Sequence, residues 1–186
     1  MRLRLFAIAL ASVVLLAACG TQRQVAAVDP NTGRLVSEKG TVTEATVVTS
    51  HKFDLPRHKQ MAFVSGLGNY GVDQLRMFGY FDQVVSYDDL QKIVISNRLQ
   101  EQVPSLNEPI GLSKLYRAYK PFLWVHFKRV ERQNKPYLQL VASNPDTLDE
   151  VFVAEVHMDF VWAGVTDQNA RYPLFNAFNR WVQQNK

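Results

Sequence analysis

The chain has 186 residues, with 21 lysines and arginines, 17 aspartates and glutamates and a single cysteine. The charges nearly balance and no run is rich in Lys and Arg, which argues against a nucleic-acid partner. One cysteine excludes an intramolecular disulfide, so stability has to come from a packed core, for which 47% hydrophobic residues provide the material.

The N-terminus has the pattern of an export signal. Residues 1–4 carry two positive charges, on Arg2 and Arg4, and residues 5–16 carry none. This apolar run is shorter than the roughly 20 residues that a membrane-spanning helix needs, and polar residues follow it at 21–24. Residues 1–18 are therefore predicted to be a signal peptide.

The sequence LAAC, which ends at Cys19, resembles the lipobox of bacterial lipoproteins. The resemblance implies that the Cys19 thiol receives a diacylglycerol and becomes the first residue of the mature chain, held at the membrane by several acyl chains. In that family an aspartate after the cysteine usually retains the protein in the inner membrane. Gly20 at that position implies the outer membrane, on its periplasmic face. The alternative is an ordinary secretory signal that happens to contain a cysteine.

A polar segment separates the predicted lipid site from the rest of the chain. Residues 19–43 are mostly small and polar, with a turn pattern, Asp-Pro-Asn-Thr-Gly, at 29–33. We expect a flexible tether with one local hairpin and a root-mean-square reach of about 25 to 30 Å. The globular domain then spans residues 44–186, which is enough to bury about two thirds of its unfolded surface.

Strand-like and helix-like runs follow one another along this domain. Apolar and β-branched runs predict strands at residues 45–53, 60–65, 81–85, 122–131, 136–143 and 150–160. Apolar residues at helical spacing predict helices at residues 69–78, after Ser86, at 112–119 and at 173–184. Ser86 and Asp89 have the spacing of a capping box. We predict a single α+β domain in which three to four helices pack on an antiparallel or mixed sheet of about five strands.

The order of these elements and the stretch GYFDQVVSYDDLQ, residues 79–91, resemble a group of small periplasmic lipoprotein domains. The group includes the N-terminal domain of the Tol propeller protein, the curli-secretion lipoprotein and the lipoprotein activators of penicillin-binding proteins. The resemblance covers most of residues 45–186 and implies an α+β fold in the envelope. None of the motifs of these families maps residue by residue onto this chain, so the resemblance implies no site.

The stretch GLGNYG, residues 66–71, spells G-x-G-x-x-G after a predicted strand, the pattern of a dinucleotide-binding turn. Asp88 and Asp89 follow about 20 residues later, where such folds place a ribose-binding carboxylate. Against a nucleotide, the later strands form a meander and not a doubly wound parallel sheet, and the two aspartates have a role at a helix start. We expect a tight strand-to-helix turn and no nucleotide, with an anion at the helix N-terminus left open.

Strand alternation in the last three predicted strands separates two faces of the sheet. The apolar face is predicted to be core: Leu123, Val125, Phe127, Leu138, Leu140, Phe152, Ala154, Val156 and Met158. The other face mixes an aromatic residue, histidines and both charges: Trp124, His126, Lys128, Gln139, Val141, Val153, Glu155 and His157. This mixed face is expected to be solvated or covered by a helix, or else to bind a partner through Trp124, His126, Lys128, Glu155 and His157.

The sequence offers no arrangement of residues that is typical of catalysis. The histidines lack the short spacing of a helical zinc site, and no serine stands in a G-x-S-x-G context. His126 and His157 are expected two strands apart, about 10 Å from each other, which is too far for a shared ligand. We therefore predict no metal, no cofactor and no catalytic residue.

The expected role is a non-enzymatic accessory module, attached to the membrane by its N-terminal lipid, that binds another envelope protein. Two alternatives stay open. One is a hydrolase of envelope material that works through His126 or His157, and the other is a stabilising or surface-covering role without a specific partner.

Overall fold

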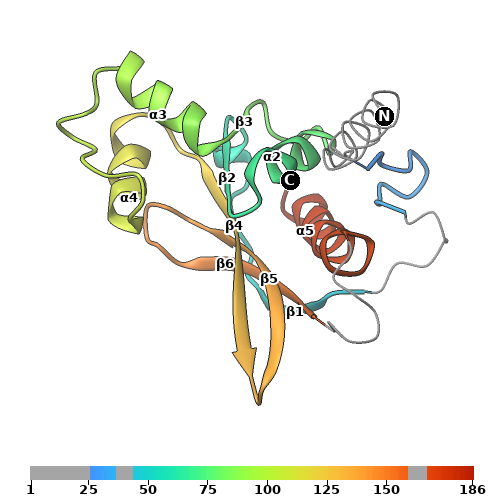
Figure 1. The fold of residues 1–186 in the computed structure, drawn as a ribbon. Coiled ribbons are helices and arrows are strands. Elements are labelled where there is room, and N and C mark those ends of the chain that lie inside the picture. Colours follow the sequence, from blue (N-terminus) through green and yellow to red (C-terminus); the bar gives the residue numbers. More distant parts are fainter. Residues whose placement is uncertain (1–25, 37–43, 159–166) are drawn as a thin grey trace, which may run out of the picture.

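The computed structural model describes residues 26–36, 44–158 and 167–186. Cys19, the predicted signal peptide and parts of the predicted tether lie outside these ranges. Within them, a six-stranded mixed sheet and four α-helices form one domain, which confirms the predicted α+β class (Figure 1). No helix of the described ranges is long and apolar enough to cross a membrane.

The sheet joins a parallel part to an antiparallel part. Its strands lie in the order β1-β6-β5-β4-β2-β3. β2 pairs in parallel with β3 and β4, whereas β4, β5, β6 and β1 pair with one another antiparallel. A bulge between Val47 and Thr49 interrupts the ladder of the edge strand β1. The strands are β1 (Thr46–Ser50), β2 (Ala62–Ser65), β3 (Val84–Val85), β4 (Leu123–Arg132), β5 (Lys135–Ser143) and β6 (Glu150–His157).

The helices have the positions that the sequence predicts, with differences at their ends. They are α2 (Gly68–Arg76), α3 (Tyr87–Ser96), α4 (Pro109–Ala118) and α5 (Tyr172–Asn185). The predicted capping box of α3 is present, because the Asp89 N–H donates to Ser86 Oγ (3.2 Å) and the Ser86 N–H donates to the Asp89 carboxylate (3.1 Å). α4 begins three residues earlier than predicted, at Pro109, because proline suits the first turn of a helix.

Strand β3 is shorter than the predicted run of residues 81–85. It contains only Val84 and Val85, because the preceding Asp82 N–H donates to the Lys59 carbonyl (3.0 Å) and leaves the ladder. Strand β6 ends at His157, within the predicted run of residues 150–160, whose last two residues lie outside the described ranges.

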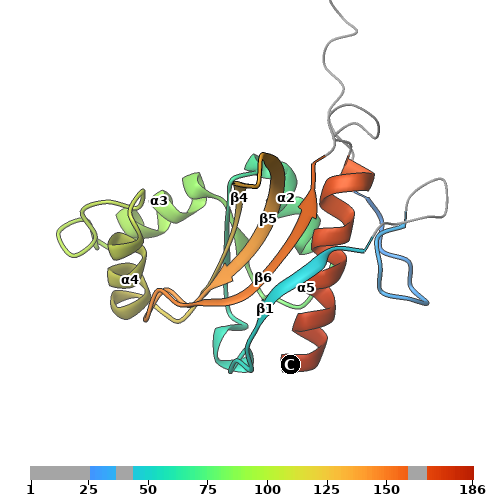
Figure 2. The same cartoon turned by 90° about the horizontal axis from the view of Figure 1, so that it is seen from below.

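Each face of the sheet carries a packed core. Helices α2 and α5 lie on one side of the sheet, and α3 and α4 lie on the other side at the parallel end (Figure 2). Eight of the nine residues of the predicted core face are buried, and Phe127 is partly buried against them. Trp181 of α5 packs on Phe152 and Phe178, with ring centroids 5.4 and 5.7 Å apart, so α5 closes this core.

The described part of the predicted tether packs against the domain. Residues 26–36 form the expected hairpin, in which Val28 and Leu35 make an isolated bridge. Leu35 is fully buried in the core beneath α2 and α5. Residues 26–36 therefore belong to the folded domain, and the predicted assignment of this part of the chain to a flexible tether is wrong.

Candidate functional site

The pairing register brings the predicted mixed face together. On β4, β5 and β6, one row across the sheet contains His126, Val141 and Val153, and the next row contains Lys128, Gln139 and Glu155. Because side chains of directly paired residues share a face, all the predicted residues of this surface lie on one side of the sheet, opposite the α2–α5 core. The predicted face assignment is confirmed.

Trp124 and His126 form an aromatic stack at the start of this face. Their rings are 4.2 Å apart between centroids and 27° from parallel. The Trp124 indole N–H donates to Ser65 Oγ (3.0 Å) on the neighbouring strand β2, where Ser65 is the register partner of His126. Both rings are half-buried, and the hydrogen bond holds the indole in one orientation.

His126 is neutral at pH 7. Burial, together with the nearby Lys128 cation, lowers its pKa to about 4, against a smaller opposing effect of Glu150. None of the described residues gives its buried Nδ1 atom a hydrogen-bond partner. The ring is therefore uncharged, and a neutral imidazole costs less to cover with a partner than an imidazolium would.

Two ion pairs lie on the same face as the stack. Lys128 Nζ is 2.6 Å from the Glu150 carboxylate, and both side chains are partly exposed. Further along the face, the two Glu155 oxygens accept from Arg132 (2.7 Å) and from Gln139 (2.7 Å). Glu155 is buried, so it positions Arg132 and offers no free carboxylate to a partner.

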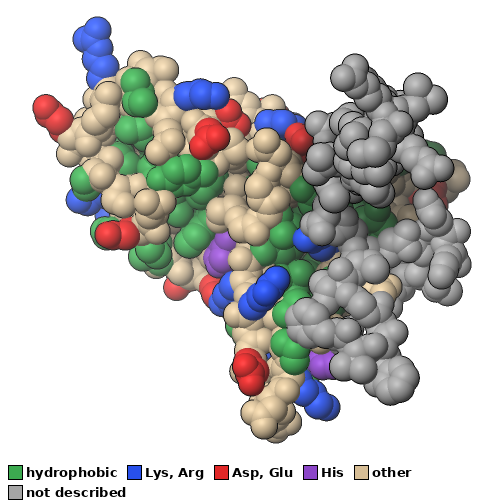
Figure 3. Space-filling model, in the orientation of Figure 1, with side chains coloured by type: hydrophobic (Ala, Val, Ile, Leu, Met, Phe, Trp, Pro, Cys, Tyr) green, Lys and Arg blue, Asp and Glu red, His purple; other side chains and the backbone are tan. Residues whose placement is uncertain are grey.

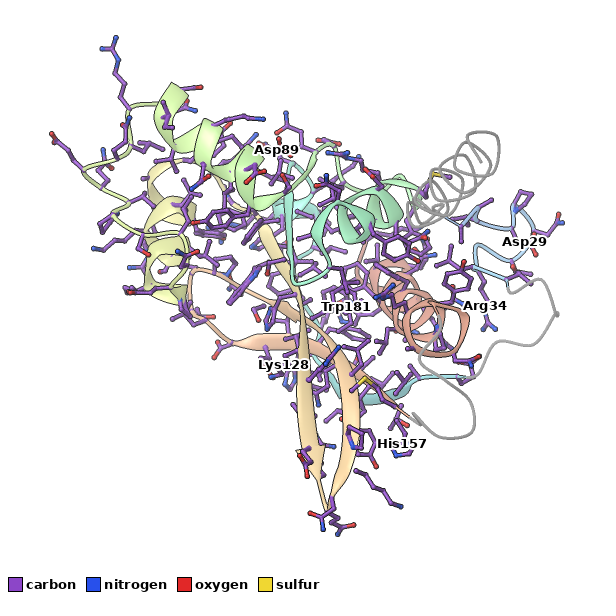
Figure 4. The ribbon with its side chains drawn as sticks, in the orientation of Figure 1. Asp29, Arg34, Asp89, Lys128, His157 and Trp181 are labelled. Carbon is purple, nitrogen blue, oxygen red and sulfur yellow. The ribbon has the colours of Figure 1, made fainter. Side chains whose placement is uncertain are left out.

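His157 does not join His126. It is exposed at the end of β6 and makes an edge contact with Tyr137, with ring centroids 5.3 Å apart. His157 lies two rows along the sheet from His126, and strand β5 lies between their strands. Standard strand spacing and rise then put their Cα atoms about 17 Å apart. The two histidines cannot share a ligand or a proton. Figure 4 shows His157 further toward the tip of the β4–β5 hairpin than Lys128.

The middle of the mixed face is not solvated. Val141 and Val153 are 0% and 3% exposed, and Gln139 is buried beside them. Apart from His157, what stays accessible is the group around the stack formed by Ser65, Trp124, His126, Lys128 and Glu150, which we call the sheet-face cluster. The sequence predicted three of its members, whereas Ser65 and Glu150 join through pairings that strand alternation alone does not reveal.

The glycine-rich stretch is a strand-to-helix turn. β2 ends at Ser65 and α2 begins at Gly68. Gly66 has a φ of +94°, and a Cβ there would lie 2.8 Å from the Phe127 carbonyl oxygen, so only glycine fits. Asp89 is committed to the capping box of α3. These contacts explain both parts of the dinucleotide-like pattern by backbone geometry.

Three hollows border α3. One, of about 340 Å³, borders the starts of α2 and α3, and two ion pairs line it, Arg76 with Asp73 (2.9 Å) and Lys92 with Asp89 (3.7 Å). A second, of about 630 Å³, lies between β3 and α3. The third is a groove of about 390 Å³ between α3 and the following loop, with an uncharged lining that the sequence did not reveal. Among the described residues, no group of three His, Cys, Asp or Glu side chains is arranged to hold a metal ion.

Charges of both signs are interspersed over the face of the molecule that Figure 3 shows. In Figure 3 the basic and acidic side chains of this view alternate with apolar ones, and neither sign dominates. Comparison with protein-family models, curated proteins and solved structures finds no match to this chain. The resemblance to periplasmic lipoprotein domains therefore stays a prediction.

Proposed function

We propose that this protein is a lipid-anchored lipoprotein of the outer membrane that faces the periplasm and binds another envelope protein without turning over a substrate. The LAAC sequence at Cys19 and the preceding apolar run support the anchor. The sheet-face cluster supports the binding role.

The observation that carries the binding role is the half-exposed stack of Trp124 on His126. Interface hot spots are enriched in tryptophan and lie in well-packed surroundings with a polar border. The Trp124 indole is already fixed by Ser65, so little conformational freedom remains to be lost on binding. The Lys128–Glu150 pair at its edge supplies one charge of each sign, which suits a protein surface with complementary charges.

Photo-crosslinking in intact cells tests this role. A crosslinking residue in place of Lys128, whose side chain is 37% exposed, samples the border of the cluster. The same residue in place of Lys92, which is 76% exposed on α3, is the matched control. We expect one envelope protein to be captured from position 128 and not from position 92. Capture of the same proteins from both positions, or of none, contradicts the proposed face.

A hydrolase is the second candidate, because the structure places Ser65 beside His126 on adjacent strands. The Glu150 carboxylate is also near enough to act on the pKa of His126. However, Ser65 Oγ accepts from Trp124, and no hydrogen bond joins Ser65 to His126 among the described contacts. Labelling by a fluorophosphonate that is lost in Ser65→Ala would favour this candidate over the binding module.

A further inference from the structure

The hairpin of residues 26–36 is held on the domain by side-chain amides that pair with its backbone. Gln74 of α2 accepts from the Ala26 N–H (3.1 Å) and donates to the Ala26 carbonyl (3.0 Å). Asn176 of α5 does the same with Leu35, at 2.7 and 3.0 Å. Each carboxamide thus makes the two backbone hydrogen bonds that a neighbouring strand would make to one residue of the hairpin.

These contacts form a built docking site. With the hairpin docked, Gln74 is 0% exposed and Asn176 is 8% exposed. Asn179 adds a third contact by donating to the Gly33 carbonyl (2.8 Å). Leu35 is part of the core below. Undocking would break all of these hydrogen bonds and withdraw Leu35 from the core, so the docked state is favoured.

The docked hairpin shortens the connection to the lipid. Ala26 is seven positions after Cys19, and an extended chain of that length reaches at most about 25 Å. If the chain were free up to Glu44, the 25-residue connection could reach roughly 90 Å. Among the described residues, Ala26 is therefore the one nearest to Cys19 in the chain that is held on the domain.

The place of the hairpin decides which end of the domain is near the lipid. The hairpin lies beside α2 and α5, and α3 and α4 lie at the opposite end of the molecule in both views (Figures 1 and 2). Asp29 and Arg34, labelled in Figure 4, mark its position. An attachment shorter than the domain restricts its rotation, whereas a long tether leaves every orientation open.

We infer that the end formed by the hairpin, α2 and the first half of α5 faces the lipid bilayer, and that residues 26–36 act as a docked strap which keeps Ala26 within about 25 Å of the lipid on Cys19. This inference rests on the lipid anchor of the proposed function. It places α3, α4 and the uncharged groove on the side away from the membrane, where they are open to the periplasm.

Energy transfer to a membrane dye tests the orientation. The lipidated full chain is placed in vesicles of phosphatidylethanolamine and phosphatidylglycerol that contain an acceptor lipid, with a donor dye on an azide-bearing residue at Asn31 or at Lys114. Both positions are exposed, one on the hairpin and one on α4. We expect clearly stronger transfer from position 31. Equal transfer from the two positions overturns the inference.

Two insertions distinguish a docked strap from a free tether. Fifteen Gly and Ser residues between Gln22 and Arg23 lengthen the strap and should reduce the difference between the two dyes by at least half. The same insertion between Lys39 and Gly40 lies between two points held on the domain, Leu35 and Glu44, and should leave the difference unchanged. Equal effects of both insertions would mean that the whole segment is a free tether.

Hydrogen exchange tests the docking without any lipid. In the Cys19→Ser chain, the amides of Ala26 and Leu35 should exchange slowly. Gln74→Leu should accelerate exchange at Ala26, whereas Gln91→Leu, at an exposed position of α3, should not. Fast exchange at both amides of the Cys19→Ser chain refutes the strap. If exchange is slow but the full chain with Cys19 does not enter vesicles, the docking is supported and only the lipid anchor is refuted.

Discussion

Replacement of His126 by phenylalanine should make the protein less sensitive to acid. Phenylalanine retains an aromatic ring against Trp124 and has no group that takes up a proton. In the natural protein, burial and the Lys128 cation lower the pKa of His126 to about 4, from an ordinary value of 6.5. The unfolded chain therefore binds a proton below pH 6.5, whereas the folded chain binds it only near pH 4.

The magnitude follows from this difference in proton binding. Above pH 6.5 the ring is neutral in both the folded and the unfolded chain, and the unfolding free energy does not change through His126. Between pH 6.5 and about pH 4 only the unfolded chain binds the proton, so the unfolding free energy falls as the pH falls. The loss is at most about 1.4 kcal/mol per pH unit. Acidification from pH 7.5 to pH 5 should thus cost about 2 kcal/mol of unfolding free energy through His126.

Urea unfolding of the unlipidated protein at pH 7.5 and pH 5 measures this loss. The change between the two pH values should be about 2 kcal/mol smaller for His126→Phe than for the natural protein. The buried His58, whose pKa is also lowered mainly by burial, acts in both proteins and cancels. The control is His157→Phe, which makes the same replacement at an exposed position and should not reduce the effect of acid on stability. If His126→Phe loses as much unfolding free energy between pH 7.5 and pH 5 as the natural protein, the His126 ring is not held neutral in the folded protein.

Four further substitutions test separate parts of the protein. Cys19→Ala should move the protein out of the membrane fraction, as an unprocessed or soluble form, and unchanged fractionation would refute the lipid anchor. Ser86→Ala removes the capping box of α3 and should lower the unfolding free energy in urea by about 1 kcal/mol. Gly66→Ala should cost about 3 kcal/mol in the same assay, because its Cβ meets the Phe127 carbonyl at a positive φ. Gly68→Ala, with φ of +56° and open space around the Cβ, should cost only about 1 kcal/mol; equal costs would mean that the backbone approach at Gly66 is not tight.

Much of the sheet could be predicted because its strands alternate. At the start of β4 the apolar residues Leu123, Val125 and Phe127 stand at every second position, so the burial of Leu123 and Val125 on one side and the position of His126 on the other follow from the period of a strand. The start of α3 was equally predictable, because a capping box involves residues only three positions apart. These features depend on local patterns.

The features that could not be predicted depend on contacts between distant residues. Gln74 and Ala26 are 48 residues apart, and Asn176 and Leu35 are 141 apart. A short polar hairpin has no period that reveals such partners. Glu155 stands at a position that alternation assigns to the mixed face, yet it is buried, because the Arg132 and Gln139 side chains pair with it.

The bulge in β1 affects contacts between copies of the protein, which the proposed lipid anchor would bring together on one membrane. Anchored molecules meet their own copies often, and an exposed strand with regularly spaced donors and acceptors would act as a template for sheet growth between them. Val47 and Val48 are each 47% exposed on this strand, yet the extra residue of the bulge breaks the spacing there. The opposite border of the described sheet, β3, has two residues. Neither border presents a regular strand long enough to start aggregation between neighbouring copies.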